Sequence, residues 1–277
     1  MWKIAALRVV GCNVSTLDDH ALAADLAERA GKLLIDLRAQ GGDPGTLRDS
    51  GDRQSHEFLM AELAQARPND AVLSEEGIDD KARLAADRVW IVDPLDGTRE
   101  FGEPGRTDWA VHVALWARDA SADGGRLIAG AVALPAQNLV LATEPAAPAG
   151  DPHLTERAGG AGRPIRMVVS RSRASELVKD VAARIDAELV PHGSAGAKVA
   201  TVVLGENDVY LHSGGFYEWD TAAPVAVARQ RGFHVSRIDG SRVVYNQEDP
   251  LLPDILVCRP AIAPVLLNAI REAKHAI

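Results

Sequence analysis

Five acidic residues stand where apolar segments of this chain pass into turns. They are Glu75, Glu76, Asp93, Asp96 and Asp220. A carboxylate in such a place is costly to bury unless positive charge lies opposite it. Because the group contains neither His nor Cys, its oxygen ligands favour Mg²⁺ over Zn²⁺. Two such ions about 4 Å apart can hold the attacking and leaving oxygens of a phosphoryl transfer.

The segment VWIVDPLDGT carries the most specific of these signals. Pro94 fixes the turn, Gly97 lets another backbone approach closely, and Thr98 brings a hydroxyl group to the carboxylates. Phosphatases of the haloacid dehalogenase type also have two Asp residues before Gly-Thr, but with a single residue between them. Here two residues separate Asp93 from Asp96, so we do not expect an aspartyl-phosphate mechanism.

The composition is that of an acidic globular protein with an ample core. The chain has 277 residues, of which 47% are hydrophobic, and a net charge of −9. That charge argues against binding a nucleic acid polymer or an anionic membrane through phosphate contacts. Arg8 interrupts the apolar run near the start, so we expect neither a signal peptide nor a membrane span. Cys12 and Cys258 match no zinc spacing, which favours a reduced, cytoplasmic location.

The first half of the chain has the pattern of helices followed by a sheet. Leucines at helical spacing predict an amphipathic helix within 16–42, capped by Thr16 or Asp18 and ended by Gly41, and a second helix follows at 53–66. Strands are expected at 70–77, 87–97, 108–117 and 127–143. The acids of the first motifs therefore lie at strand ends.

The second half alternates strands with helices, after a Pro-, Gly- and Ala-rich loop at 144–164. The expected order is strand, helix, strand, helix, strand, helix, strand, strand, helix, at 165–170, 174–185, 187–193, 195–205, 208–213, 220–232, 234–238, 254–258 and 264–276. We therefore expect one domain over 1–277, made of an α+β half at 16–143 with most metal ligands and an α/β half at 164–277 with the substrate-binding segments.

The motifs DPLDGTREF, EWDTAAP and SEEG together resemble those of the lithium-sensitive, Mg²⁺-dependent phosphatase superfamily. This superfamily includes inositol monophosphatase, fructose-1,6-bisphosphatase and the 3′(2′),5′-bisphosphate nucleotidases. The resemblance covers nearly the whole chain from about residue 18. It implies the layered αβαβα sugar-phosphatase fold, a small phosphate-ester substrate and a homodimer.

The resemblance also implies how the metal ions are held. One Mg²⁺ would be bound by Glu75, Asp93 and the backbone carbonyl of Leu95. A second would be bound by Asp93, Asp96 and Asp220, so that Asp93 bridges the two ions. Glu75 with waters could hold a third, weaker ion.

A hydroxyl and an acid are expected beside the metals to act on the nucleophilic water. Thr98 would orient this water, assisted by an acid that follows a Thr-x-x-Asp pattern in the family. The segment LRDSGDRQSHEF offers Asp52 for this role, with Asp49 in the Thr position and as the alternative. Glu76 would support the metal ligands from outside.

The segments around these motifs are similar to the actinobacterial CysQ-type nucleotidases. They are YEWDTAAP, VVSRSR, GSAGAK and YNQEDPLLPD. The similarity implies conversion of 3′-phosphoadenosine 5′-phosphate to AMP and phosphate, an activity that serves sulfate assimilation. The phosphate that is not hydrolysed would need hydroxyl and basic donors. The residues expected to contact the substrate are Gly97, Thr98, Ser170, Arg171, Ser172, Ser194, Lys198 and Glu218.

Two other functions remain open at this point. The shared metal motif does not separate the nucleotidase from an inositol-1-monophosphatase or a fructose-1,6-bisphosphatase. The other open function is a catalytically silent metal- or nucleotide-binding module. The complete set of acids argues against it. Trp109 and Trp219 could flank a base, although a Trp beside a metal loop is more often part of the core.

Overall fold

Two long helices begin the part of the chain that the computed structural model describes, which is residues 16–122, 124–144, 163–172 and 174–275. They are α1 (Asp19–Ala39) and α2 (Pro44–Ala66). The side chain of Asp18 caps α1 as predicted, by accepting a hydrogen bond from the backbone N–H of Ala21. The predicted start of the second helix at residue 53 is wrong. Asp43 caps α2 and Pro44 fits its first turn, where no N–H is needed.

The first sheet has the strand order β1-β2-β3-β4-β5, in which β1 and β2 are parallel and the other pairs antiparallel. Its strands are β1 (Ala71–Ser74), β2 (Arg88–Asp96), β3 (Ala110–Asp119), β4 (Gly124–Leu134) and β5 (Leu139–Ala142). The predicted single strand over 127–143 is therefore two strands. A short 3₁₀ turn, Pro135–Gln137, separates them, since Pro135 lacks the N–H that a strand would use.

The second sheet has the order β7-β6-β8-β10-β9. Strands β6, β7 and β8 are parallel, whereas β10 runs antiparallel to β8 and β9. The predicted alternation of elements is confirmed throughout this half. The elements are β6 (Arg166–Ser170), α5 (Glu176–Arg184), β7 (Glu188–His192), α6 (Ala195–Val203), β8 (Val209–Tyr217), α7 (Glu218–Gln230), β9 (His234–Ser236), β10 (Leu251–Cys258) and α8 (Ala263–His275).

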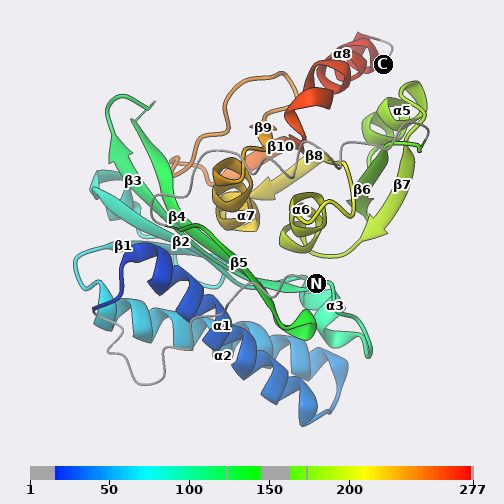
Figure 1. Cartoon of the computed structure of the whole chain (residues 1–277). Helices are drawn as coiled ribbons and strands as arrows, with labels where there is room; N and C mark the ends of the chain where they lie inside the picture. Colours follow the sequence, from blue (N-terminus) through cyan, green and yellow to red (C-terminus); the bar gives the residue numbers. More distant parts are fainter. Residues whose placement is uncertain (1–15, 123, 145–162, 173, 276–277) are drawn as a thin grey trace.

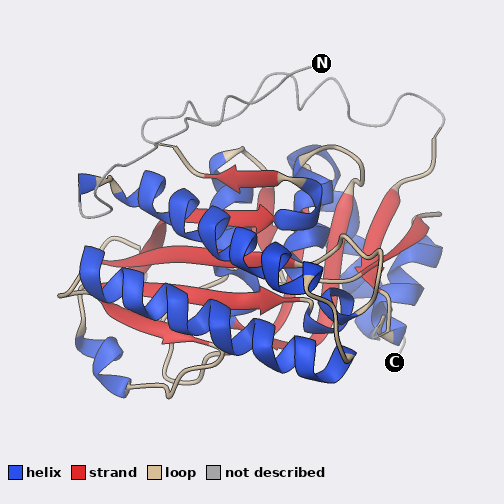
Figure 2. Ribbon diagram, turned by 90° about the horizontal axis from the view of Figure 1, so that it is seen from below, coloured by secondary structure: helices blue, strands red, loops and turns tan. Residues whose placement is uncertain are grey.

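The elements stack in layers (Figure 1). Helices α1 and α2 lie side by side across one face of the first sheet (Figure 2). Helices α6 and α7 fill the space between the two sheets, and α5 and α8 cover the outer face of the second sheet (Figure 1). This arrangement confirms the predicted layered αβαβα fold.

Strand β2 runs through the middle of this stack and is packed on both faces. Its residues alternate between two apolar cores: Ile91 belongs to the core around α6 and α7, and Val92 to the core beneath α1 and α2. Strong packing on both faces holds the strand rigidly where it delivers Asp93 and Asp96. Both acids are buried.

Some predicted features fall outside the described residues, namely Cys12, Arg173 of VVSRSR and most of the loop at 144–164. Cys258 lies buried in β10, and burial raises the pKa of its thiol to about 12. A further short helix, α3 (Thr98–Gly102), follows β2 directly. Within the described ranges, no helix is both long and apolar enough to cross a membrane.

Candidate active site

The turn after β2 is held in place from its own backbone and from α2. The backbone N–H of Leu95 donates a 3.0 Å hydrogen bond to Oδ1 of Asp93. From α2, the hydroxyl of Ser55 donates to the carbonyl oxygen of Pro94 at 2.7 Å. Gly97 adopts φ +88°, and a Cβ there would also be crowded by neighbouring backbone and side-chain atoms. The tertiary structure thus fixes the direction of both Asp side chains.

Asp96 is surrounded by donors. Its Oδ2 accepts hydrogen bonds from the hydroxyl of Ser194 at 2.5 Å and from the N–H of Gly196 at 2.7 Å. Nε2 of His112 lies 3.2 Å from the same oxygen. Burial alone would raise the pKa of Asp96, but His112, Lys198 and Ser194 outweigh it and lower this pKa to about 2. Asp96 therefore remains a carboxylate.

Asp93 has the opposite environment. Within the part of the chain that the structure describes, no donor lies within hydrogen-bonding distance of its buried Oδ2. Burial and the charges of Glu75, Asp96 and Asp220 raise the pKa of Asp93 well above its usual range. A buried carboxylate crowded by three others requires a cation to remain ionised. This orphaned oxygen, in a site rich in carboxylates, fits a hard divalent ion such as Mg²⁺.

Glu75 and Asp220 reach this pair from two further elements. Glu75 directly follows β1, which is parallel to β2, and its N–H donates to the carbonyl of Val92. Asp220 lies in the first turn of α7, where its Oδ2 accepts from the N–H of Tyr217 at 2.6 Å. Although part of Glu75 reaches solvent, desolvation and the charge of Asp220 raise its pKa to about 7. The structure thus brings together the four acids that the sequence predicted as ligands.

The predicted hydroxyl and acid also meet. Oγ1 of Thr98 lies 3.3 Å from Oδ1 of Asp52 and 3.1 Å from the carbonyl oxygen of Leu95. Burial and the charge of Glu76 raise the pKa of Asp52 to about 7. Asp49 is exposed on the same helix. The geometry therefore pairs Thr98 with Asp52, and it places Glu76 close enough to act on Asp52 through its charge.

Among the predicted substrate contacts, the segment Ser170 to Ser172 lies beside α3. The guanidinium of Arg171 donates to Glu100 and Glu103 at 2.8 Å, and its side chain is 31% exposed. Ser172 is exposed as well. These groups are therefore accessible to a ligand, although Arg171 already has two carboxylate partners.

Three of the predicted substrate contacts have different roles in the structure. Lys198 is buried, and its Nζ donates to the carbonyl oxygens of Gly193 and Ser194 at 3.2 and 2.6 Å. Ser194 is also buried, and its hydroxyl bonds to Asp96 and caps α6 by accepting from the N–H of Ala197. Both residues thus support Asp96 instead of facing solvent.

Glu218 is the third of these buried residues. It is fully buried, and its two carboxylate oxygens accept from the backbone N–H groups of Asn246 and Gln247 at 2.7 and 2.8 Å. Burial raises its pKa to about 7. Its position next to the Trp of the EWDT motif suggested a role in substrate binding, but the side chain points into the interior and anchors the segment after β9.

His112 is a site residue that the sequence analysis missed. It lies on β3 directly across from Asp93 in the strand register, and its Nδ1 is 3.1 Å from the carbonyl oxygen of Trp219. Asp93, Asp96 and His112 form a buried cluster whose ligand atoms all lie within 4.8 Å of one another. A single His inside the otherwise apolar strand AVHVALW was the signal that could have indicated it.

The two tryptophans differ. Trp109 is fully buried and packs edge-on against Phe101, so it belongs to the core. Trp219 stacks on Tyr217 with ring centroids 4.7 Å apart, and Tyr217 is 44% exposed. An aromatic stack of this kind, just before Asp220, provides a flat apolar surface beside the acids.

Comparison with known proteins agrees with this geometry. Residues 21–275 match the model of the inositol monophosphatase family. The 3′-phosphoadenosine 5′-phosphate phosphatase of Mycobacterium leprae is 50% identical over 261 residues, which cover 92% of this chain and 94% of that protein.

Solved structures show the same fold. CysQ from Bacteroides thetaiotaomicron is 28% identical and superposes with a TM-score of 0.69. The match covers 88% of this chain and 98% of that one. Inositol monophosphatase II from Staphylococcus aureus is 19% identical and superposes with a TM-score of 0.73. The match covers 91% of this chain and 94% of that one. The resemblance predicted from the motifs is confirmed, and the chain belongs to the inositol monophosphatase family.

Proposed function

We propose that this chain is a Mg²⁺-dependent phosphatase that converts 3′-phosphoadenosine 5′-phosphate to AMP and phosphate. The observation that carries the proposal is the convergence of four carboxylates from β2, α7 and the turn after β1, together with the contact between Thr98 and Asp52. The mycobacterial relative that is 50% identical is named for this activity, which supports the choice of substrate. In the cell the reaction would remove a by-product of sulfate assimilation.

The acids are proposed to hold two to three Mg²⁺ ions. Glu75, Asp93 and the carbonyl oxygen of Leu95 would bind one ion, and Asp93, Asp96 and Asp220 a second. Bound there, the ions would supply the positive charge that the acids lack and would polarise the phosphate ester and the attacking water. Because Ser194 and Gly196 occupy Oδ2 of Asp96, its Oδ1 is the atom left to face an ion.

Thr98 and Asp52 are proposed to move the proton of the nucleophilic water. Oγ1 of Thr98 would accept a hydrogen bond from this water and pass its own proton toward Oδ1 of Asp52. A carboxylate whose pKa is raised to about 7 is well matched to accept a proton near neutral pH. Glu76 would maintain this raised pKa through its own charge.

The remaining parts of the substrate are proposed to bind on the sides of the acid cluster. Arg171, with the hydroxyls of Ser170 and Ser172, would contact the 5′-phosphate, while Gly97 and Thr98 would lie against the phosphate that is hydrolysed. The stacked rings of Tyr217 and Trp219 would support the adenine base. We also propose a cytoplasmic homodimer, which sedimentation analysis would test.

The experiment is phosphate release from three esters, 3′-phosphoadenosine 5′-phosphate, 3′-AMP and inositol 1-phosphate, with Mg²⁺ or with EDTA. We expect the bisphosphate to have the highest kcat/KM and EDTA to abolish turnover of all three. Li⁺ and Ca²⁺ should inhibit, since Ca²⁺ prefers a larger and looser coordination shell than Mg²⁺. A preference for inositol 1-phosphate would instead indicate an inositol monophosphatase. Full activity in EDTA would exclude a metal-dependent mechanism.

The companion variant is Asp93→Asn, which keeps the shape of the side chain but removes its charge. We expect a loss of kcat on the order of 10³-fold or more, because the bridging position would no longer hold its cations. Circular dichroism should show an unchanged fold. Substantial turnover by this variant at saturating Mg²⁺ would contradict the proposed ligand set.

A further inference from the structure

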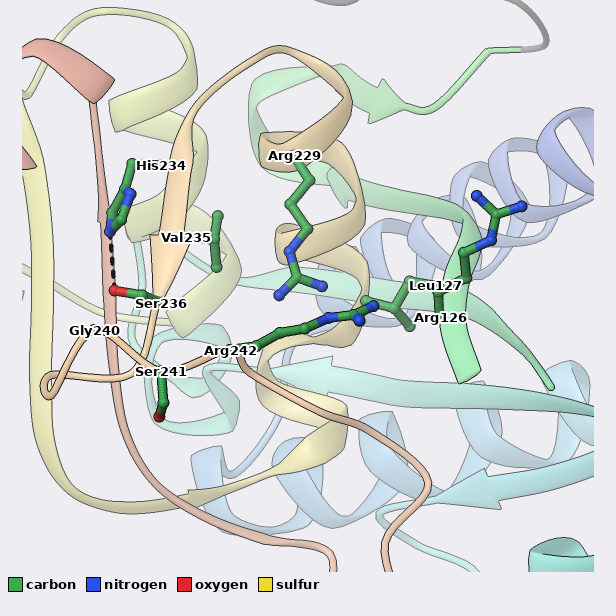
Figure 3. A pocket seen from close by; sticks show the side chains of 9 residues that line it. All are labelled: Arg126, Leu127, Arg229, His234, Val235, Ser236, Gly240, Ser241 and Arg242. Atoms are coloured by element: carbon green, nitrogen blue, oxygen red, sulfur yellow. Dashed lines mark hydrogen bonds between the residues drawn. The ribbon is translucent and has the colours of Figure 1, made fainter. Parts of the chain in front are cut away.

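A cavity lies at the other end of α7 from the acid cluster. Its volume is about 470 Å³, within the range of roughly 300–1,000 Å³ that is usual for small-molecule sites. Its walls come from β4, α7, β9 and the loop after β9, as the side chains in Figure 3 show. The cavity is therefore assembled from segments that are far apart in the sequence.

Three arginines are among the residues that line this cavity, and within the described part of the chain none of the lining residues is acidic. The three are Arg126 of β4, Arg229 of α7 and Arg242 of the loop (Figure 3). Arg229 is partly buried, and it donates to the carbonyl oxygen of Val243 at 3.1 Å. Burial, together with the like charge of Arg242, lowers the pKa of Arg229. Two positive charges that repel one another on the wall of a cavity would be stabilised by an anion between them.

Asp119 lies beside two of these arginines. Asp119 lies 3.1 Å from Nε of Arg126, whose side chain remains 62% exposed, and Asp119 also acts on Arg242 through its charge. The whole chain carries a net charge of −9. A pocket with this excess of guanidinium groups is thus a local inversion of the overall charge, which favours a phosphate-bearing ligand.

Two apolar side chains also line the cavity. Leu127 and Val235 contribute aliphatic surface beside the arginines (Figure 3). A bare inorganic phosphate would leave this surface and most of the volume unused. The combination fits a phosphate group attached to a compact organic part.

The length of α7 separates the cavity from the acid cluster. Asp220 lies in the first turn of the helix and Arg229 in the last, and nine residues correspond to about 14 Å along a helix axis. This separation is too long for the two phosphates of one nucleoside bisphosphate to bridge. The cavity is thus not part of the proposed substrate site.

We propose that this cavity is a second ligand site, which binds a small phosphorylated metabolite through Arg229 and Arg242 and packs its organic part against Leu127 and Val235. The site is independent of the catalytic reaction and of its metal ions. Arg126 stands at the edge of the site and adds to its positive potential.

The test is calorimetric titration of the full-length protein with ribose 5-phosphate, with and without Mg²⁺, and with inorganic phosphate for comparison. We expect ribose 5-phosphate to bind when Mg²⁺ is withheld, and more tightly than inorganic phosphate. Arg242→Gln should weaken this binding roughly 10-fold or more, since a charge-assisted contact is lost. Arg229→Lys, which keeps the charge but loses the planar fork, should weaken it less than Arg229→Gln.

The matched control is Arg184→Gln on α5, which removes one positive charge from a pair with Asp180 on another surface. It should leave binding unchanged, and Arg242→Gln should leave phosphate release unchanged. Because Arg242 is exposed, its variant is expected to fold even if Arg229→Gln does not. The activity assay is separate, so failure of this proposal and failure of the proposed function can be distinguished.

Four results would overturn the proposal. One is no detectable binding at 0.15 M salt, and another is equal weakening by Arg184→Gln, which would indicate a diffuse charge effect. Loss of binding in Asp93→Asn but not in Arg242→Gln would place the ligand at the acid cluster. If inorganic phosphate binds as tightly as ribose 5-phosphate, the cavity does not recognise an organic part and the proposed ligand class is wrong.

Discussion

At the scale of single residues, the site depends on giving chemically identical side chains different environments. Asp93 and Asp96 are three positions apart, and both are buried. Asp96 receives hydrogen bonds from Ser194 and Gly196 and keeps its charge without any metal, whereas Oδ2 of Asp93 has no such partner among the residues that the structure describes. Asp93 therefore needs a neighbouring cation to remain ionised far more than Asp96 does.

The first prediction concerns the proton relay of Thr98 and Asp52. Thr98→Ala and Asp52→Asn should each lower kcat by about 10²-fold or more, the usual contribution of general acid–base groups. The double variant should be barely slower than the slower single variant, because groups that act as one unit are non-additive. Steady-state phosphate release measures all three. If the fold-loss in kcat of the double variant equals the product of the two single losses, the residues act independently and Asp52 does not serve in the relay.

The second prediction contrasts an exposed cation with a buried one. Arg171→Gln should lower kcat/KM for 3′-phosphoadenosine 5′-phosphate by roughly 10- to 100-fold and leave 3′-AMP, which lacks the 5′-phosphate, nearly unchanged. Lys198→Met should lower kcat/KM equally for both substrates, since Nζ of Lys198 supports the backbone next to Asp96. Selective loss on the bisphosphate in Lys198→Met would instead show that this lysine contacts the second phosphate.

At the scale of elements, the start of α6 is the part that links the two halves at the site. Gly196 donates its N–H to Asp96 and also lies against the ring of His112 on β3. A Cβ on this residue would lie 2.0 Å from Nε2 of His112. The close approach of α6 to β2 and β3 therefore requires glycine at this position.

The third prediction follows from this contact. Gly196→Ala should push His112 and Asp96 apart, lower the free energy of unfolding by about 1 to 3 kcal/mol and greatly reduce kcat. Urea unfolding and phosphate release would measure the two effects. Gly45→Ala, near the start of α2, is the control for activity, because a Cβ there would meet only the side chain of Asp43, which caps α2 and is not part of the acid cluster. Full activity in Gly196→Ala would show that the position of His112 is unimportant.

At the scale of the whole molecule, a buried arginine joins segments from the two halves of the sequence. Arg83 is 1% exposed, and it donates to both oxygens of Asp79 and to Oδ1 of Asn246 at 2.7 Å. The N–H of Asn246 in turn donates to Glu218. This network connects the turn after β1 with the segment that precedes β10.

The fourth prediction is the pH dependence of this network. Hydrogen bonds from Arg83 lower the pKa of Asp79 from 3.8 to about 2. A depressed folded-state pKa gives stability that is complete above the unfolded value and is lost as pH falls toward the folded one. Because Asp79 is partly exposed and solvent screens its charge, urea unfolding should find wild type about 1 kcal/mol more stable than Asp79→Asn at pH 6, and about half of that difference should remain at pH 3. A difference that does not change with pH would exclude the charge of Asp79 as its source.

Much of the fold could be predicted from the sequence, because the patterns that determine secondary structure are local. Apolar periodicity gave the order of strands and helices in the second half, and turn residues placed the acids at strand ends. The errors at 53–66 and 127–143 have local causes: α2 gains two turns from the Asp43–Pro44 cap, and Pro135 divides an apolar run into two strands.

The sequence by itself determined the family, and it predicted the set of acids, the choice of Mg²⁺ and the pairing of Asp52 with Thr98. The tertiary structure alone decided which of the polar side chains are exposed and which are buried and bonded within the fold. Ser194 bonds to Asp96 across 98 positions of sequence, Glu218 is fully buried, and His112 meets the acids through strand pairing. The physical reason is that burial and hydrogen-bond partners come from segments brought together by packing, so the spacing within a motif cannot specify them.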